Sequence, residues 1–199
     1  MARSPYLAAI VGYVLCTATA ATFVYLAQAR ITHTELGSAI ARTHFFSRID
    51  LWVSAVTLVV QLVIAAPLIK LVGPGVVLCI LPVVQGLGIA ALVTSPTLAT
   101  LAVVAVAGRA ATHGLTRPAR ELLFTVIPRA DKYRAKNVID TMVYRFGDFS
   151  SSWLNRGLTA AGAGVIAIAA LPLSAAWLVL AVALGVGFRR RATLAKELP

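Results

Sequence analysis

Long apolar stretches, separated by short polar or basic ones, make up most of this chain. Each stretch approaches the roughly 17 to 25 residues that a helix needs to cross the hydrocarbon core of a bilayer. The pattern therefore predicts an all-α integral membrane protein built as a bundle of six transmembrane helices. The expected spans are 5–29, 49–69, 76–93, 98–115, 146–170 and 173–188, with a cytoplasmic connection over 116–145.

Turn residues separate several of these stretches. Gly73, Pro74 and Gly75 follow the second, and Ser95 with Pro96 divides the third from the fourth. The first stretch stays apolar to Ala29 without a clear small-residue cleavage site, so we expect a membrane helix there and not a signal peptide.

Composition agrees with lipid as the solvent of this chain. Hydrophobic residues make up 59% of the sequence and charged residues 13%, and the mean hydropathy is +0.87, which leaves too little polar surface for a water-soluble globule. The net charge of +11 comes from residues between the apolar stretches and near the chain end. Membrane topology explains these charges better than nucleic-acid binding does.

The distribution of Lys and Arg predicts the orientation. One face collects Arg3, Lys70, and the basic residues of 109–145 and 189–196, whereas the other collects Arg30, Arg42 and Arg48. Positively charged loops are retained in the cytoplasm, so both termini are expected there, in the cell inner membrane. An even number of spans agrees with this orientation.

Polar side chains inside two spans recur at helical spacing, so each set shares one helix face. The set in the second span is Asp50, Ser54, Thr57 and Gln61, and that in the fifth is Arg145, Asp148, Ser152 and Arg156. Such faces form either interhelical hydrogen-bonding seams or the wall of a polar cavity. We expect a substrate cavity lined by Asp50, Gln61, Arg145, Asp148 and Arg156.

The connection between the fourth and fifth spans mixes charges with regularly spaced apolar residues. Its candidate functional residues are Arg117, Arg120, Glu121, Lys132, Lys136 and Asp140. Two interpretations remain open: an amphipathic segment that lies among lipid headgroups, or a basic loop that gates the protein or attracts a substrate.

The sequence does not favour an enzyme. His33, His44 and His113 do not form a metal-binding spacing with carboxylates, and no phosphate-binding glycine loop or serine nucleophile elbow is present. We expect no metal and no cofactor. Membrane lipid is the expected environment, with an anionic small molecule as the possible substrate.

Two segments resemble a known family. Residues 42–50 read RTHFFSRID, and residues 117–148 contain RPARE, DKYRAKNVID and YRFGD. In this order they resemble the C-terminal half of bacterial major-facilitator-like proteins related to the ATP/ADP translocases. The resemblance covers nearly the whole chain and implies half of a major-facilitator-type fold. The translocases carry a lysine in a Gly-Lys-Ser-Gly-Gly pattern close to this position, whereas this chain has Asp148 there.

The resemblance implies a carrier that works by alternating access between two six-helix halves. The second half is then either another copy of this chain, as a homodimer, or a separate N-terminal six-helix half. The solute is expected to be anionic or nucleotide-like, with arginines binding it and Asp50 or Asp148 serving as counter-ion or proton site. The rival hypothesis is a non-transporting membrane subunit, or a truncated remnant, that packs on a partner.

Arg156→Ala tests the predicted cavity. If Arg156 binds the anionic solute, this substitution should abolish uptake or binding in reconstituted vesicles while the protein still inserts into the membrane. Unchanged transport would contradict the assignment.

Overall fold

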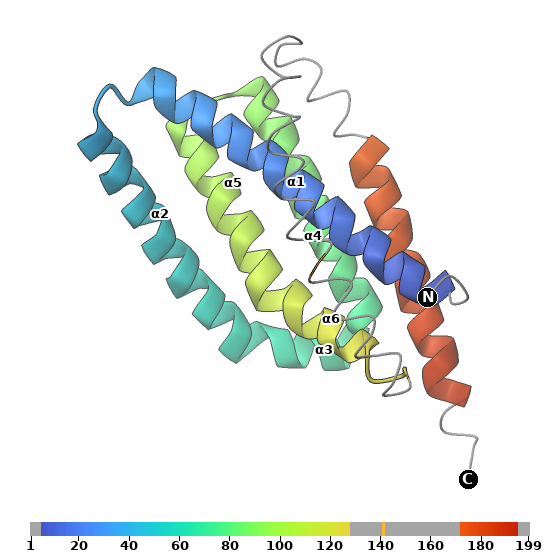
Figure 1. Cartoon of the computed structure of the whole chain (residues 1–199). Coiled ribbons are helices and arrows are strands. Elements are labelled where there is room, and N and C mark those ends of the chain that lie inside the picture. Colours follow the sequence, from blue (N-terminus) through green and yellow to red (C-terminus); the bar gives the residue numbers. More distant parts are fainter. Residues whose placement is uncertain (1–4, 128–140, 142–171, 195–199) are drawn as a thin grey trace.

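The structure, a computed structural model, describes residues 5–127, 141 and 172–194. The chain there is helical, without a strand in the described part (Figure 1). Its elements are α1 (Pro5–Glu35), α2 (Ala39–Val59), the π-helical segment η1 (Val60–Ala65), α3 (Ala66–Val72), α4 (Pro74–Thr94), α5 (Leu98–Ala110), the π-helical segment η2 (Ala111–Thr116), α6 (Arg117–Leu123) and a last helix, Pro172–Leu194.

In two places, a π-helical segment joins two α-helices into one continuous helix, which we call a rod. One rod consists of α2, η1 and α3, and the other of α5, η2 and α6. Counted in this way, the described chain contains 5 helices that are long and apolar enough to cross a membrane. The protein is therefore a multi-pass helical membrane protein. The expected span 146–170 lies outside the described residues, as do most residues of the expected connection.

The helices are longer than the apolar pattern alone indicates. The helix that contains the expected span 49–69 already begins at Ala39, and α5 continues through η2 and α6 to Leu123. The first residues expected in the connection 116–145 are thus helical. Pro118 is the second residue after the π-helical segment η2, and the helix continues past it although proline has no N–H to donate to the preceding turn.

Local sequence signals account for the helix ends. The Ser38 side chain accepts a hydrogen bond from the Ala41 N–H at 3.1 Å, and Thr97 does the same for the Thr100 N–H at 3.2 Å. Both are standard N-caps, which satisfy a free N–H of the first helical turn. Between α3 and α4, Gly73 adopts a φ of 83°, a left-handed conformation that favours glycine.

The start of α1 and the end of the last helix lie at the same end of the bundle, which we call the terminal end (Figure 1). The Tyr6 hydroxyl donates to the Leu123 carbonyl at 3.1 Å, and the guanidinium of Arg191 lies 4.7 Å from the centre of the Tyr6 ring. Arg189 reaches the Val72 carbonyl at 3.5 Å. The start of α1 and the ends of α3, α6 and the last helix therefore meet here, whereas Glu35 and Pro172 lie at the opposite end.

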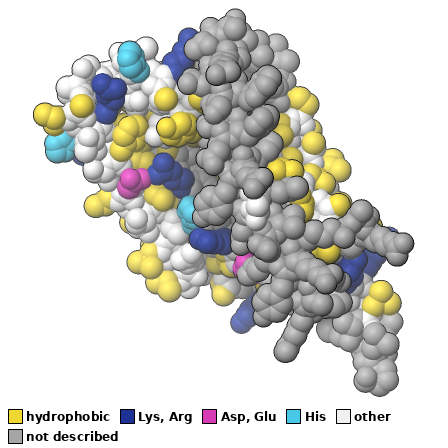
Figure 2. Space-filling view, in the orientation of Figure 1, with side chains coloured by type: hydrophobic (Ala, Val, Ile, Leu, Met, Phe, Trp, Pro, Cys, Tyr) yellow, Lys and Arg dark blue, Asp and Glu magenta, His cyan; other side chains and the backbone are white. Residues whose placement is uncertain are grey.

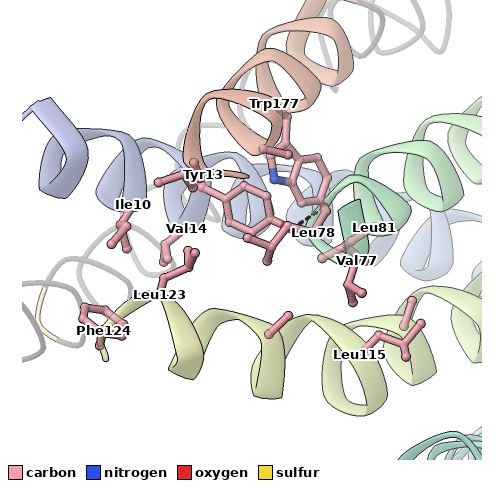
Figure 3. Close-up of a cluster of buried hydrophobic side chains, with 14 of the residues drawn as sticks. Ile10, Tyr13, Val14, Val77, Leu78, Leu81, Leu115, Leu123, Phe124 and Trp177 are labelled. Carbon is pink, nitrogen blue, oxygen red and sulfur yellow. Dashed lines mark hydrogen bonds between the residues drawn. The ribbon is translucent and has the colours of Figure 1, made fainter. Parts of the chain in front are cut away.

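The main core lies between α1, α4 and the last helix, with α6 closing one side (Figure 3). Tyr13 meets Trp177 edge to face at 5.7 Å, and its hydroxyl donates to the Leu78 carbonyl at 2.9 Å. Between α4 and the last helix, Gly75 and Gly185 approach so closely that a Cβ added to Gly185 would lie 2.9 Å from the Gly75 Cα. Such glycine contacts let membrane helices pack backbone to backbone.

The rod of α2, η1 and α3 is peripheral. It packs against α5 and η2 (Figure 1). Large apolar side chains such as Leu51, Trp52 and Leu62 are exposed on it. Apolar surface of this extent suits lipid and not water.

Gly185→Leu tests the close contact of α4 with the last helix. The new side chain has no space beside Gly75, so we expect the free energy of unfolding to fall by about 1–3 kcal/mol or more. The measurement is a lower midpoint of thermal unfolding in detergent. Gly37→Leu is the matched control, since a Cβ at Gly37 meets nothing within 4 Å. Equal midpoints for the two variants would contradict the packing.

Candidate functional site

An ion pair joins the two rods. Arg109 Nη1 on α5 donates to Asp50 Oδ1 on α2 at 2.5 Å, and the two side chains are 43% and 65% exposed respectively. An α-helix rises about 1.5 Å per residue, so Arg109 lies about 16 Å along its 26-residue helix from Leu98. A charge at this depth is costly unless it is paired or hydrated, and Asp50 provides the pairing.

The helix that carries Arg109 extends beyond the span expected from the sequence. The basic pattern groups Arg109 with the charges of the connection, at the end of its span. In the structure the helix continues through α6 to Leu123, so Arg109 lies well inside it. Arg109 is therefore near the middle of this helix, where its side chain is partly exposed and pairs with Asp50.

The two π-helical segments face each other below this ion pair, and each is followed at the same distance by a proline. Pro67 follows η1 and Pro118 follows η2, in each case as the second residue after the segment. Proline has no N–H to donate to the preceding turn. A widened turn before a proline is one way in which a helix accommodates this loss.

Because Pro118 has no N–H, one backbone carbonyl of η2 loses its helical hydrogen-bond donor. The Arg117 N–H donates to the Thr112 carbonyl, five residues back, and Pro118 has no N–H for the next carbonyl, that of His113. Gln61 Nε2 of η1 donates to this His113 oxygen at 3.0 Å. A side chain of one rod thus replaces the backbone donor that the other rod lacks.

Gly114 lets the two π-helical segments come into contact. A Cβ at this position would lie 2.7 Å from Val60 Cγ1, so no larger residue fits without a shift of the rods. The face that carries Asp50, Thr57 and Gln61 is therefore the seam between α2 and the α5 rod, one of the two interpretations that the sequence left open.

A cavity of about 320 Å³, lined by both apolar and polar residues, lies on the other side of Arg109, between α1, α4, α5 and η2. Small apolar residues form part of its wall. Its polar lining residues are Tyr25, Gln28, Gln85, Arg109, Thr112 and His113.

Gln85 is the most buried polar residue of this wall. It is 7% exposed, and its Oε1 has no hydrogen-bond partner in the part of the chain that the structure describes. Its amide packs over Gly108, where a Cβ would lie 3.0 Å from Oε1. Buried amide oxygens are nearly always hydrogen-bonded, so Gln85 Oε1 is available to accept a hydrogen bond from a further donor.

Charged and titratable side chains continue from the cavity toward the terminal end. Arg109, His113, Arg117 and Glu121 follow one another at intervals of four along α5, η2 and α6, and all four are exposed. Figure 2 shows basic, histidine and acidic side chains gathered in this way across the middle of the visible face. They form a polar track from Arg109 to the end of α6.

The structure places the sequence-predicted residues in different settings. Asp50 reaches the cavity only through Arg109, and Gln61 holds η2 and does not line the cavity. Arg117, Arg120 and Glu121 lie on α6. The remaining candidates, Arg145, Asp148, Arg156, Lys132, Lys136 and Asp140, lie outside the described residues.

Sequence reasoning missed Arg109 and Gln85, the two residues that give the cavity its charge and its buried amide. A signal existed for Gln85, because it is the one amide inside the apolar span 76–93. An arginine inside a membrane span also indicates a functional site. The charge pattern groups Arg109 with the basic residues of 109–145, because it lies near the expected end of the span 98–115. Within the described residues, no three His, Cys, Asp or Glu side chains come together as a metal site.

Comparisons of the chain with protein-family models, with curated proteins and with solved structures found no match. We therefore infer the function from the geometry of the ion pair and the cavity.

The bond between Gln61 and His113 can be tested by a double-mutant cycle. Gln61→Leu leaves the His113 carbonyl without a donor, so we expect it to lower the free energy of unfolding by about 1–2 kcal/mol. Pro118→Ala restores a backbone N–H, and in that background the same substitution should cost clearly less. Unfolding of the four proteins in detergent measures both costs, and equal costs would contradict the proposed exchange of donors.

Proposed function

We propose that this chain is the six-helix component of a membrane carrier for an anionic solute. The bundle forms one half of a major-facilitator-type transporter and works by alternating access together with a second six-helix unit, either another copy or a separate half. The proposal is carried by the position of Arg109. This charged side chain lines the cavity and lies about 16 Å along its helix from Leu98.

Arg109 suits an anion by its chemistry. Among the cavity-lining residues of the described chain, it is the only arginine or lysine. The planar guanidinium offers a fork of donors that matches a carboxylate or a phosphate. An ionisable group in this position is costly, and the usual reason for its presence is a functional one.

The π-helical segments support a moving part. Interrupted helices beside a central site are a common feature of membrane carriers, because they let one part of the bundle bend against another. Here η1 and η2 touch each other at Gly114, one turn beyond Arg109 along the rod. A bend at this level changes access to the cavity.

The positions of the helix ends support six spans with both termini in the cytoplasm. Leu123 lies at the terminal end and Pro172 at the opposite end, which is the arrangement that one further crossing between them produces (Figure 1). The terminal end is also the more basic one. It carries Lys70, Arg117, Arg120, Arg189, Arg190 and Arg191, whereas Arg30 and Arg42 lie near the other. Positive charge of this kind marks the cytoplasmic side.

Uptake by reconstituted vesicles tests the proposed function. The purified chain, alone and with any co-purifying partner, is assayed with a panel of labelled organic anions and nucleotides. Arg109→Gln should reduce uptake at least about tenfold, the cost of losing a charge-assisted hydrogen bond. Arg42→Gln, which removes an equal charge near the opposite end, should leave uptake unchanged.

Two results would overturn the proposal. Uptake that does not depend on Arg109 would remove the cavity from the mechanism. Absence of uptake and of binding for every anion in the panel, with correctly inserted protein, would favour a membrane subunit without transport activity that packs on a partner.

A further inference from the structure

We infer that Asp50 is the resident counter-anion of Arg109, and that a small monocarboxylate carrying a hydrogen-bond donor displaces it when it enters the cavity. This inference rests on the proposed function, since it names the solute class and the internal competitor of the same site. Its evidence is the juxtaposition of the Asp50–Arg109 ion pair, the cavity, and the Gln85 Oε1 atom, which has no hydrogen-bond partner in the described part of the chain.

The ion pair leaves Arg109 able to exchange partners. Asp50 engages Nη1, whereas a guanidinium carries five N–H donors, and Arg109 also lines the cavity. Asp50 is 65% exposed and can be hydrated when it releases the guanidinium. A solute carboxylate that takes its place forms the same type of bond, so the charge opposite Arg109 stays the same.

The charge and volume of the cavity limit the solute. One guanidinium balances one negative charge, and no lysine or second arginine lines the described part of the wall. The volume of about 320 Å³ is at the lower end of the roughly 300–1,000 Å³ of typical ligand pockets. Both properties favour a small monoanion and disfavour a nucleoside triphosphate, which brings several charges and a large base.

Gln85 adds a requirement for a donor. Its Oε1 is buried, has no hydrogen-bond partner among the described residues, and packs over Gly108, which is next in sequence to Arg109. A hydroxyl or ammonium group close to the solute carboxylate satisfies this oxygen while the carboxylate contacts Arg109. A solute without such a donor leaves the amide unsatisfied and binds less well.

Binding to the full chain in lipid nanodiscs tests this inference, with lactate, acetate and ATP as labelled probes. Lactate carries a carboxylate and a hydroxyl, acetate the carboxylate alone, and ATP several charges. The variants are Asp50→Asn, Arg109→Gln, the double variant of both, and Gln85→Leu. Glu35→Gln and Arg42→Gln are matched controls, because each removes one charge outside the cavity.

We expect lactate to bind more tightly than acetate, and ATP not to bind. Asp50→Asn should raise the affinity for lactate about tenfold, because the competing carboxylate is gone. Arg109→Gln should abolish binding. The double variant should also abolish it. Because the double variant has no unpaired charge, it controls for misfolding caused by an unpaired Asp50 in Arg109→Gln. Gln85→Leu should weaken lactate about tenfold and leave acetate unchanged.

Several results would overturn the inference. An unchanged or reduced affinity in Asp50→Asn means that Asp50 does not compete, and an equal gain in Glu35→Gln means that the effect is not local. Binding of ATP that depends on Arg109, without binding of lactate, contradicts the solute class but leaves the proposed function intact. Absence of binding for all three probes, together with absence of vesicle uptake for the wider panel, overturns both.

Discussion

Two charged side chains on membrane-length helices pair with each other, because Arg109 on α5 donates to Asp50 on α2. Arg109 lies near the middle of the 26-residue helix Leu98–Leu123, where a charge is costly unless it is paired or hydrated. The ion pair is one of the contacts that join α2 to α5. It also leaves a guanidinium at the wall of a cavity, where its remaining donors are available to a ligand.

The second constraint is the need of every backbone carbonyl for a donor in an environment without water. Pro67 and Pro118 each remove one N–H from a membrane-spanning rod, and both rods widen into a π-helical segment just before the proline. In η2 the resulting free carbonyl of His113 is satisfied from the neighbouring rod by Gln61. The defect of one helix thus becomes a contact between two, below the ion pair and beside the cavity.

The remainder of the bundle is packed differently. Between α1, α4 and the last helix, bulky side chains such as Tyr13 and Trp177 interlock, and Gly75 meets Gly185 backbone to backbone (Figure 3). Contacts of this type tolerate little relative displacement. The seam between α2 and the α5 rod combines an extensive helix–helix contact with two polar contacts, Asp50 with Arg109 and Gln61 with His113. The cavity lies between α1, α4, α5 and η2.

The sequence by itself determined the class of protein and the helical face that carries Asp50, Thr57 and Gln61, because both follow from local patterns: the length of apolar runs and the spacing of polar residues along one helix. Only the tertiary structure decided which partner that face meets, that Arg109 lies near the middle of its helix, and that Gln85 borders the same cavity as Arg109. The reason is physical. A helix continues or ends according to hydrogen bonds and packing supplied by other segments, and a cavity is formed by residues far apart in the chain, so neither is encoded in the periodicity of a single stretch.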